Sequence, residues 1–325
     1  MKVSDLMLDL ATGDASVHDV YIQEAVGKIN VSTAIFDAAH KISELPAGEF
    51  LIVQEAADAG LPTDQEGAAN LCCESVKQSL TAFYDLIVET AKKLKSNSDK
   101  DLKLLVTIGK KYGVAAPSGN YVEGFVEPLV NAIMADAGKK LTLADKRFLK
   151  AKYSEEIAEC YGMGMTNFLS AFGMEFDNAA LTNNYRPYKT RREVTSFKAL
   201  LKNMSYGGKI MNFDKTISKE KHYTDTINAS DLTELITALV EVHQISTAIV
   251  NVAGNSAAKK NSMAIVTELC DKEDCESKKV SKNITAINDG IKGWTEIVAA
   301  MSENVPKAFN DSITSLMDSI SGSQS

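Results

Sequence analysis

The sequence predicts a mainly α-helical fold, built as a bundle of long amphipathic helices, and three observations support this expectation. Apolar residues make up 45% of the 325 residues and charged residues 24%, which is the balance of a chain that folds around a core. Only 7% of the residues are aromatic, so aliphatic side chains carry most of the apolar content. Over most of the chain these side chains recur at alternating spacings of three and four residues, the period of an amphipathic helix.

Residues 1–176 are expected to form an N-terminal helical domain. A helix is predicted over about residues 16–45 by a stripe with steps of 4, 3, 4 and 3, whose members are Ile22, Val26, Ile29, Thr33 and Phe36. Thr63 and Glu66 have the spacing of a capping box. They should open a second helix that runs to about residue 95.

The remainder of this domain is predicted to contain shorter helices. The polar cluster at 96–99 is expected to break the second helix and to start another over about residues 100–112. A helix over about 121–137 follows, and Pro128 either kinks it or marks a delayed start. The next helix is expected from residue 141 to about 174.

The pattern changes over residues 177–228, which we interpret as an irregular connector between two domains. Asparagines, a proline and a pair of glycines interrupt any helical period in this segment. Residues 209–214 alternate polar and apolar side chains, so they predict either a small β-hairpin or an irregular stretch.

Residues 229–325 are expected to form a C-terminal helical bundle, with helices over about 230–252, 257–270 and 277–305. The last of these helices carries an unbroken stripe with steps of 4 and 3: Val280, Ile284, Ile287, Ile291, Trp294, Val298, Met301 and Val305. Pro306 is tolerated in the first turn of a helix, so it should begin a separate final helix.

The charge distribution argues against general nucleic-acid binding. The first hundred residues contain 8 Lys, no Arg and 16 acidic residues, a net charge of −8 that equals the formal charge of the whole chain. Binding to phosphates requires a basic surface instead.

The cysteines and the N-terminus favour a cytoplasmic protein, or one incorporated in a particle that is assembled in the cytoplasm. Five cysteines in so long a chain do not form a secreted disulfide framework, so their thiols are expected to be free. The N-terminus lacks the apolar stretch of a signal peptide. The longest charge-free runs, 160–174 and 242–258, are shorter than the roughly 20 residues that span a bilayer.

The sequence contains no recognisable motif for catalysis, a metal or a cofactor, so we expect a non-enzymatic protein. The phosphate loop, the dinucleotide fingerprint, the nucleophile elbow and the zinc motif His-Glu-x-x-His are absent. Neither His40 nor His243 follows a Glu by three positions, as a di-iron bundle requires, so both are interpreted as satisfied histidines at helix interfaces. Cys270 and Cys275 have no further zinc ligands nearby and are assigned to a solvated acidic loop.

A basic, tyrosine-containing cluster in the connector is the first of two candidate sites: Tyr185, Arg186, Tyr188, Lys189, Arg191 and Arg192. Arginine binds phosphates and carboxylates through two parallel hydrogen bonds, and tyrosine can stack on a base or a guanidinium. The favoured interpretation is a loop held against this chain's own acidic N-terminal hundred residues. An anion site, a nucleic-acid contact or a salt-bridged contact with another subunit remains the alternative.

The second candidate is the charge-free segment 160–174, which includes Met163, Met165, Phe168, Leu169 and Phe172. Glycines and methionines in one apolar stretch allow close packing and repacking. The segment predicts a buried central helix, and the alternatives are a docking face for another protein or a segment that inserts into a membrane once exposed.

These observations favour a structural or interaction protein that assembles through helical faces, either with itself or with other subunits. The chain is helical, free of catalytic motifs, rich in lysine and asparagine and poor in arginine. In this composition it resembles structural or internal proteins of bacteriophage particles, although no motif carries the likeness, and a virion component is therefore one expected context. A membrane-active helical protein and an enzyme with an unrecognised site are the alternative functions.

Overall fold

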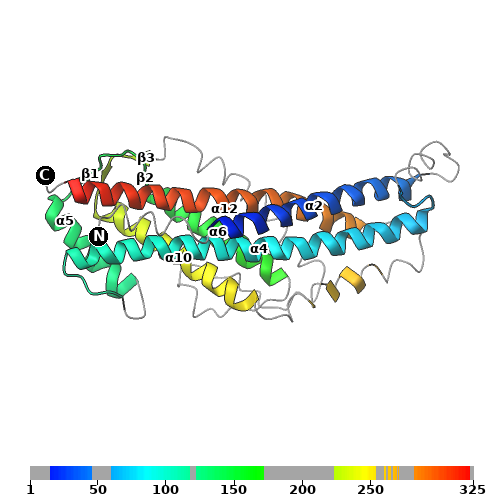
Figure 1. Cartoon of the computed structure of the whole chain (residues 1–325), viewed down its shortest axis with the longest axis horizontal. Coiled ribbons are helices and arrows are strands. Elements are labelled where there is room, and N and C mark those ends of the chain that lie inside the picture. Colours follow the sequence, from blue (N-terminus) through cyan, green and yellow to red (C-terminus); the bar gives the residue numbers. More distant parts are fainter. Residues whose placement is uncertain are drawn as a thin grey trace.

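The structure, a computed structural model, describes 15–45, 60–117, 122–171, 223–253 and 282–322, together with 260, 263–264, 266–268 and 270. The long helices of this part lie roughly along one axis and form an elongated bundle (Figure 1). Strands are confined to two short antiparallel pairs in the described residues. The prediction of a mainly α fold is therefore confirmed.

Helices α2 (Ala15–Glu44) and α4 (Gln65–Lys111) form an antiparallel pair. The stripe expected on α2 faces α4, since Ile22, Ile29, Thr33 and Phe36 are buried and Val26 is half-buried. His18 at the start of α2 contacts the carboxylate of Glu89 at 2.9 Å. The prediction of a helix over residues 16–45 is confirmed to within one residue at each end.

Helix α4 is continuous across residues 96–99, so the predicted break in this segment is wrong. The polar side chains bond within the helix and do not interrupt it. The amide of Asn97 and the hydroxyl of Ser98 each donate, at 2.8 Å, to a backbone carbonyl one turn earlier. Lys95 and Asp99 form an ion pair on the same stretch at 2.7 Å.

Side chains cap the N-termini of α4 and α10. The side chain of Asp64 caps α4 by accepting from the N–H of Gly67, so the capping box predicted at Thr63 is wrong. In α10 (Ala229–Ala253), the backbone N–H groups of Asn228 and Asp231 each donate to the other residue's side chain at 3.0 Å. In this reciprocal pair each side chain accepts from the other residue's backbone, as in a capping box.

The segment around Pro128 begins with a π-helical turn, η1 (Val122–Val126), and continues as α5 (Glu127–Ala137). Pro128 lies in the first turn of α5, where its missing N–H costs no hydrogen bond. The delayed start is therefore the alternative that the structure supports. Gly138 ends α5 in the left-handed region, with φ of 68°.

Residues 141–142 and 148–149 form short strands, so the predicted start of a helix at residue 141 is wrong. Strands β1 (Leu141–Thr142) and β2 (Phe148–Leu149) pair with β4 (Thr226–Ile227) and β3 (Tyr223–Thr224) respectively. Burial alternates from residue 141 to 144, the period of a half-buried strand. The strands at the end of the connector thus pair with an earlier segment, while the expected hairpin at 209–214 lies outside the described residues.

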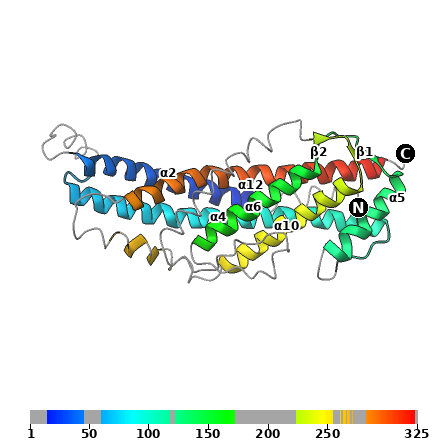
Figure 2. The ribbon, with the colours of Figure 1, turned by 180° about the vertical axis from the view of Figure 1, so that it is seen from behind.

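Helix α6 (Ala151–Ala171) and helix α10 leave the strand end of the molecule together and pack against each other (Figure 2). The hydroxyl groups of Tyr161 and Ser246, both buried, lie 2.8 Å apart between the two helices. Helix α10 also contacts α4, so this pair covers a side of α4 that α2 leaves free.

Helix α12 (Lys282–Gly322) runs antiparallel to α2 and parallel to α4. The predicted stripe from Ile284 to Val305 is buried, and it continues through Phe309, Ile313, Leu316 and Ile320. Pro306 lies inside this one helix, so the expected break there is wrong. Burial of the apolar stripe on both sides of Pro306 outweighs the hydrogen bond that the proline removes.

One hydrophobic cluster includes buried residues of α2, α4, α5, α6, α10 and α12. It contains, for example, Phe83 and Tyr161 from the N-terminal part and Trp294 and Phe309 from the C-terminal part. The division of the chain at residues 177–228 stays a prediction, because most of that segment lies outside the described residues.

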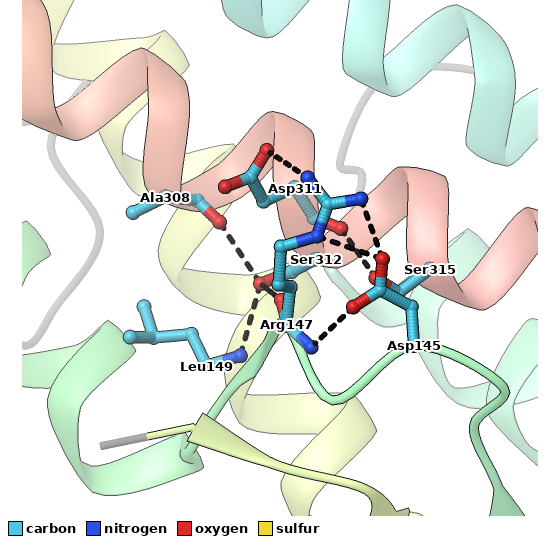
Figure 3. Close-up of polar contacts among 7 residues, drawn as sticks. All are labelled: Asp145, Arg147, Leu149, Ala308, Asp311, Ser312 and Ser315. Carbon is cyan, nitrogen blue, oxygen red and sulfur yellow. Dashed lines mark hydrogen bonds and ion pairs between the residues drawn. The ribbon is translucent and has the colours of Figure 1, made fainter. Parts of the chain in front are cut away.

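Two serines of α12 fasten the β1–β2 segment to the bundle. The N–H of Leu149 donates to the hydroxyl of Ser312 at 3.0 Å, and the N–H of Ala144 donates to that of Ser319 at 3.1 Å. The Ser312 hydroxyl in turn donates to the carbonyl of Ala308 at 2.9 Å (Figure 3). Ser312 and Leu149 are both fully buried, so the hydrogen bonds of the Ser312 hydroxyl satisfy polar groups that water does not reach.

Arg147, one of the four arginines of the chain, lies over this contact (Figure 3). Its Nε donates to Asp145 at 2.7 Å, and its Nη1 lies 3.5 Å from a carboxylate oxygen of Asp311 on α12. The guanidinium lowers the pKa of Asp145. More than half of the Arg147 side chain is exposed, so solvent screens these ion pairs.

We expect Ser312→Ala to destabilise the protein more than Arg147→Ala. Removal of the Ser312 hydroxyl leaves the buried N–H of Leu149 without its acceptor, which should cost about 1–3 kcal/mol. Loss of the exposed Arg147 ion pairs should cost much less. Urea denaturation followed by circular dichroism measures both free energies of unfolding, and a larger loss in Arg147→Ala would contradict this account.

Candidate interaction surface

The two site candidates from the sequence fall largely outside the structural description. Tyr185, Arg186, Tyr188, Lys189, Arg191 and Arg192 all lie in the undescribed segment 172–222. Met163, Met165, Phe168 and Leu169 lie in helix α6, whose backbone is described there although these side chains are not, and Phe172 lies beyond it. The roles predicted for both groups stay predictions.

A different surface stands out on helix α2. The exposed large apolar side chains of the described residues all belong to this helix: Val17 is 47% exposed, Val20 62%, Tyr21 50% and Val31 61%. A single exposed apolar side chain is ordinary, but four on one helix form a patch.

These side chains lie on one side of α2, which we call the outward face. It consists of Val17, Val20, Tyr21, Glu24, Gly27, Lys28, Val31 and Ala34, all of them exposed. Its central line runs through Val20, Glu24, Gly27, Val31 and Ala34, with steps of 4, 3, 4 and 3. This is the spacing of a seam along which a second helix can pack.

The two charges of the outward face form a pair near its middle. The ammonium of Lys28 lies 2.7 Å from a carboxylate oxygen of Glu24, one turn away. The ammonium of Lys28 donates a hydrogen bond to Glu24, and this bond together with the negative charge of Glu24 raises the pKa of Lys28. The outward face is therefore apolar at both ends and carries one opposite-charge pair in between.

The inner side of α2 is anchored to the bundle, so the outward face has a defined direction. Ile29 and Phe36 are buried against α4, and Asp19 pairs with Lys93 of α4. Near the other end of α2, Asp37 pairs with Lys292 of α12.

The sequence analysis missed the outward face, although a signal for it is present. Helix α2 carries two stripes of helical period, one through Ile22, Ile29 and Phe36 and the other through Val20, Gly27 and Val31. The sequence analysis used only the first stripe. A helix that packs on one neighbour buries one stripe, so the second stripe is the signal that indicates a free face.

A disulfide joins Cys73 of α4 to Cys270, with their Cα atoms 6.1 Å apart. The expectation of free thiols and the assignment of Cys270 to a solvated loop are therefore wrong. The partners are 197 residues apart in the chain, so spacing alone could not pair them. Free thiols therefore no longer support the expected cytoplasmic location, because disulfides persist in oxidising surroundings.

Cys72, next to this disulfide, is a free and fully buried cysteine. Its thiol donates to the carbonyl of Phe36 at 3.7 Å. Burial, with a smaller contribution from the charge of Asp37, raises the pKa of Cys72 to about 12. The thiol is therefore protonated and unreactive at neutral pH, as expected of a packing residue.

His40 and His243 both make contacts across helix interfaces. His40 stacks on Phe36 and lies 3.3 Å from the hydroxyl of Thr285 on α12. His243 of α10 lies 3.2 Å from the hydroxyl of Ser98 on α4, and burial lowers its pKa. The prediction that both are satisfied at helix interfaces is confirmed.

Asp101 is the most deeply buried carboxyl group with a resolved pKa change in the described residues. It lies on α4 and is hydrogen-bonded to the side chain of Asn310 on α12. Burial raises its pKa from 3.8 to about 7, and the bond to Asn310 and the charge of Lys100 reduce this effect only in part. Its hydrogen-bond partner is an amide on the facing helix, so Asp101 helps to pack α4 against α12.

Comparisons with known proteins add no family or relative: no protein-family model, curated protein or solved structure matches the chain. Within the described ranges, no three His, Cys, Asp or Glu side chains gather as a metal site would require. Among the helices the structure describes, none is both long enough and apolar enough to cross a bilayer.

We expect Asp101→Asn to stabilise the protein at alkaline pH. A carboxyl whose pKa is raised on folding is compatible with the fold below its unfolded value of 3.8, and it destabilises the fold increasingly as the pH rises toward about 7. The variant should thus match the wild type near pH 4 and exceed its free energy of unfolding by a few kcal/mol above pH 7. Urea denaturation across this pH range measures the difference, and a gap that does not depend on pH would contradict the assignment.

Proposed function

We propose that this chain is a non-enzymatic structural or interaction protein that assembles through the outward face of α2. The observation that carries the proposal is the gathering of the exposed large apolar side chains of the described residues on this one helix. Apolar groups in such a patch gain free energy when a partner covers them. A helix is the partner that the seam spacing fits best.

The size of the driving force is compatible with assembly. Four half-exposed side chains contribute on the order of 1 kcal/mol each when they are covered, about half the value for full burial of a valine. This sum is modest compared with the cost of association. We therefore propose either weak pairwise contacts or contacts that are repeated within a larger assembly, where many weak contacts act together.

The rigid bundle behind the face suits this function. Packing on α4 and the ion pairs of Asp19 and Asp37 hold α2 in place before any partner binds. A preorganised face loses less conformational entropy on binding than a helix that must first fold. A component of a particle such as a virion is one context in which a chain of this kind would act.

We expect Val20→Glu combined with Val31→Glu to weaken assembly and leave the fold intact. Both side chains are more than 60% exposed, so their replacement should change the free energy of unfolding by less than about 0.5 kcal/mol. Two added charges on the seam should lower the association constant about tenfold or more. Sedimentation velocity from low to high micromolar concentration measures association of the full chain.

The matched control is Thr107→Glu combined with Asn131→Asp. It adds the same two charges to exposed positions, but on α4 and α5 and not on α2. The control should assemble like the wild type. Equal loss of assembly in both variants would show a general charge effect and would contradict the proposal.

A further inference from the structure

We propose that the partner of the outward face is α2 of a second copy of this chain, packed antiparallel. The two-fold axis passes between the two helices at the level of residues 25 and 26. This inference rests on the proposed function and names its partner. A two-fold contact uses the same patch on both copies, so the patch must be complementary to itself.

The outward face meets this condition when residues whose numbers add up to 51 or 52 lie opposite each other. Val20 and Tyr21 of one copy then face the partner's Val31, and Val17 faces the partner's Ala34. The two-fold axis repeats each of these pairs. All four exposed large apolar side chains are covered in this register.

The charges select the antiparallel arrangement. In the same register Glu24 of one copy lies beside Lys28 of the other, and the axis repeats this attraction. In a parallel pair, Glu24 would face Glu24 and Lys28 would face Lys28, and both like-charge contacts are unfavourable. Glu24 and Lys28 lie one turn apart on either side of the axis, so an antiparallel pair places each charge beside an opposite one.

Gly27 supports the same crossing point. Glycine inside a helix is less favourable than alanine, and among the residues that the structure describes nothing lies within 4 Å of a Cβ built at this position. The packing of these residues does not require glycine there. Next to the axis, the missing side chain allows two helix backbones to approach closely.

The test uses Glu24→Lys and Lys28→Glu, which are expected to weaken self-association about tenfold each because they place like charges opposite each other. An equimolar mixture of the two variants should recover association, since each Lys then faces a Glu of the other copy. Glu74→Lys is the matched control, because it reverses one charge of an ion pair on α4, away from the face. Sedimentation velocity on the full chains provides the readout.

The direction of the pair is tested by cross-linking. A short bismaleimide should join Val20→Cys of one chain to Val31→Cys of another, above the background of the wild type. Val20→Cys alone should give little product. A strong product from Val20→Cys alone would show a parallel pair and would overturn the inference.

Gly27→Leu and Gly293→Leu provide a second matched comparison. Both glycines are exposed, helical and unhindered, so both variants should be at least as stable as the wild type. Only Gly27→Leu should weaken association. Equal association in both variants would overturn the crossing at Gly27.

The outcomes separate this inference from the proposed function. A chain that assembles and loses assembly in Val20→Glu plus Val31→Glu, but shows no recovery in the mixture, retains the proposed function and excludes the antiparallel pair. A chain that remains monomeric at every concentration excludes the second copy as partner. In that outcome the proposed function can no longer rest on self-assembly.

Discussion

Packing along the whole length of α4 is the constraint on which the remaining structure depends. Twenty-two of its 47 residues are buried, and they face α2, α12 and α10 in turn. A helix with buried side chains on several sides needs a separate neighbour for each of them. The neighbours are held in register by specific contacts, such as Asp101 with Asn310 and Ser98 with His243.

The same constraint explains why α2 has a free face. Its N-terminal half packs on α4, while the contact of α2 with α12 is concentrated near Asp37 and His40. Beyond that contact the outward face of α2 has no described helix against it. The candidate interaction surface is therefore a consequence of how far each helix extends along its neighbours.

Much of the fold could be predicted from the period of the apolar residues. The stripe from Ile284 to Val305 and the stripe through Ile22 and Phe36 are buried as expected, because a helical period determines which side chains share a face. The two helix breaks that were wrongly predicted have a common cause. Asn97, Ser98 and Pro306 have low helix propensity, but tertiary packing on both sides kept their helices continuous.

The candidate surface and the disulfide depend on information that local sequence does not contain. The outward stripe through Val20 and Val31 can be found by its spacing, yet spacing cannot tell which of two stripes faces α4. Cys73 and Cys270 are brought together only by the packing of the bundle. The basic cluster at residues 185–192 remains a prediction from composition.

Hydrogen–deuterium exchange of the full chain at low and high concentration tests the central claim most directly, namely that α2 is packed on one side and binds a partner on the other. At low concentration the amides of α2 should already be protected by packing on α4. At high concentration their protection should increase, while that of α10 should not change. Unprotected α2 amides at low concentration, or no increase in α2 at high concentration, would contradict the account.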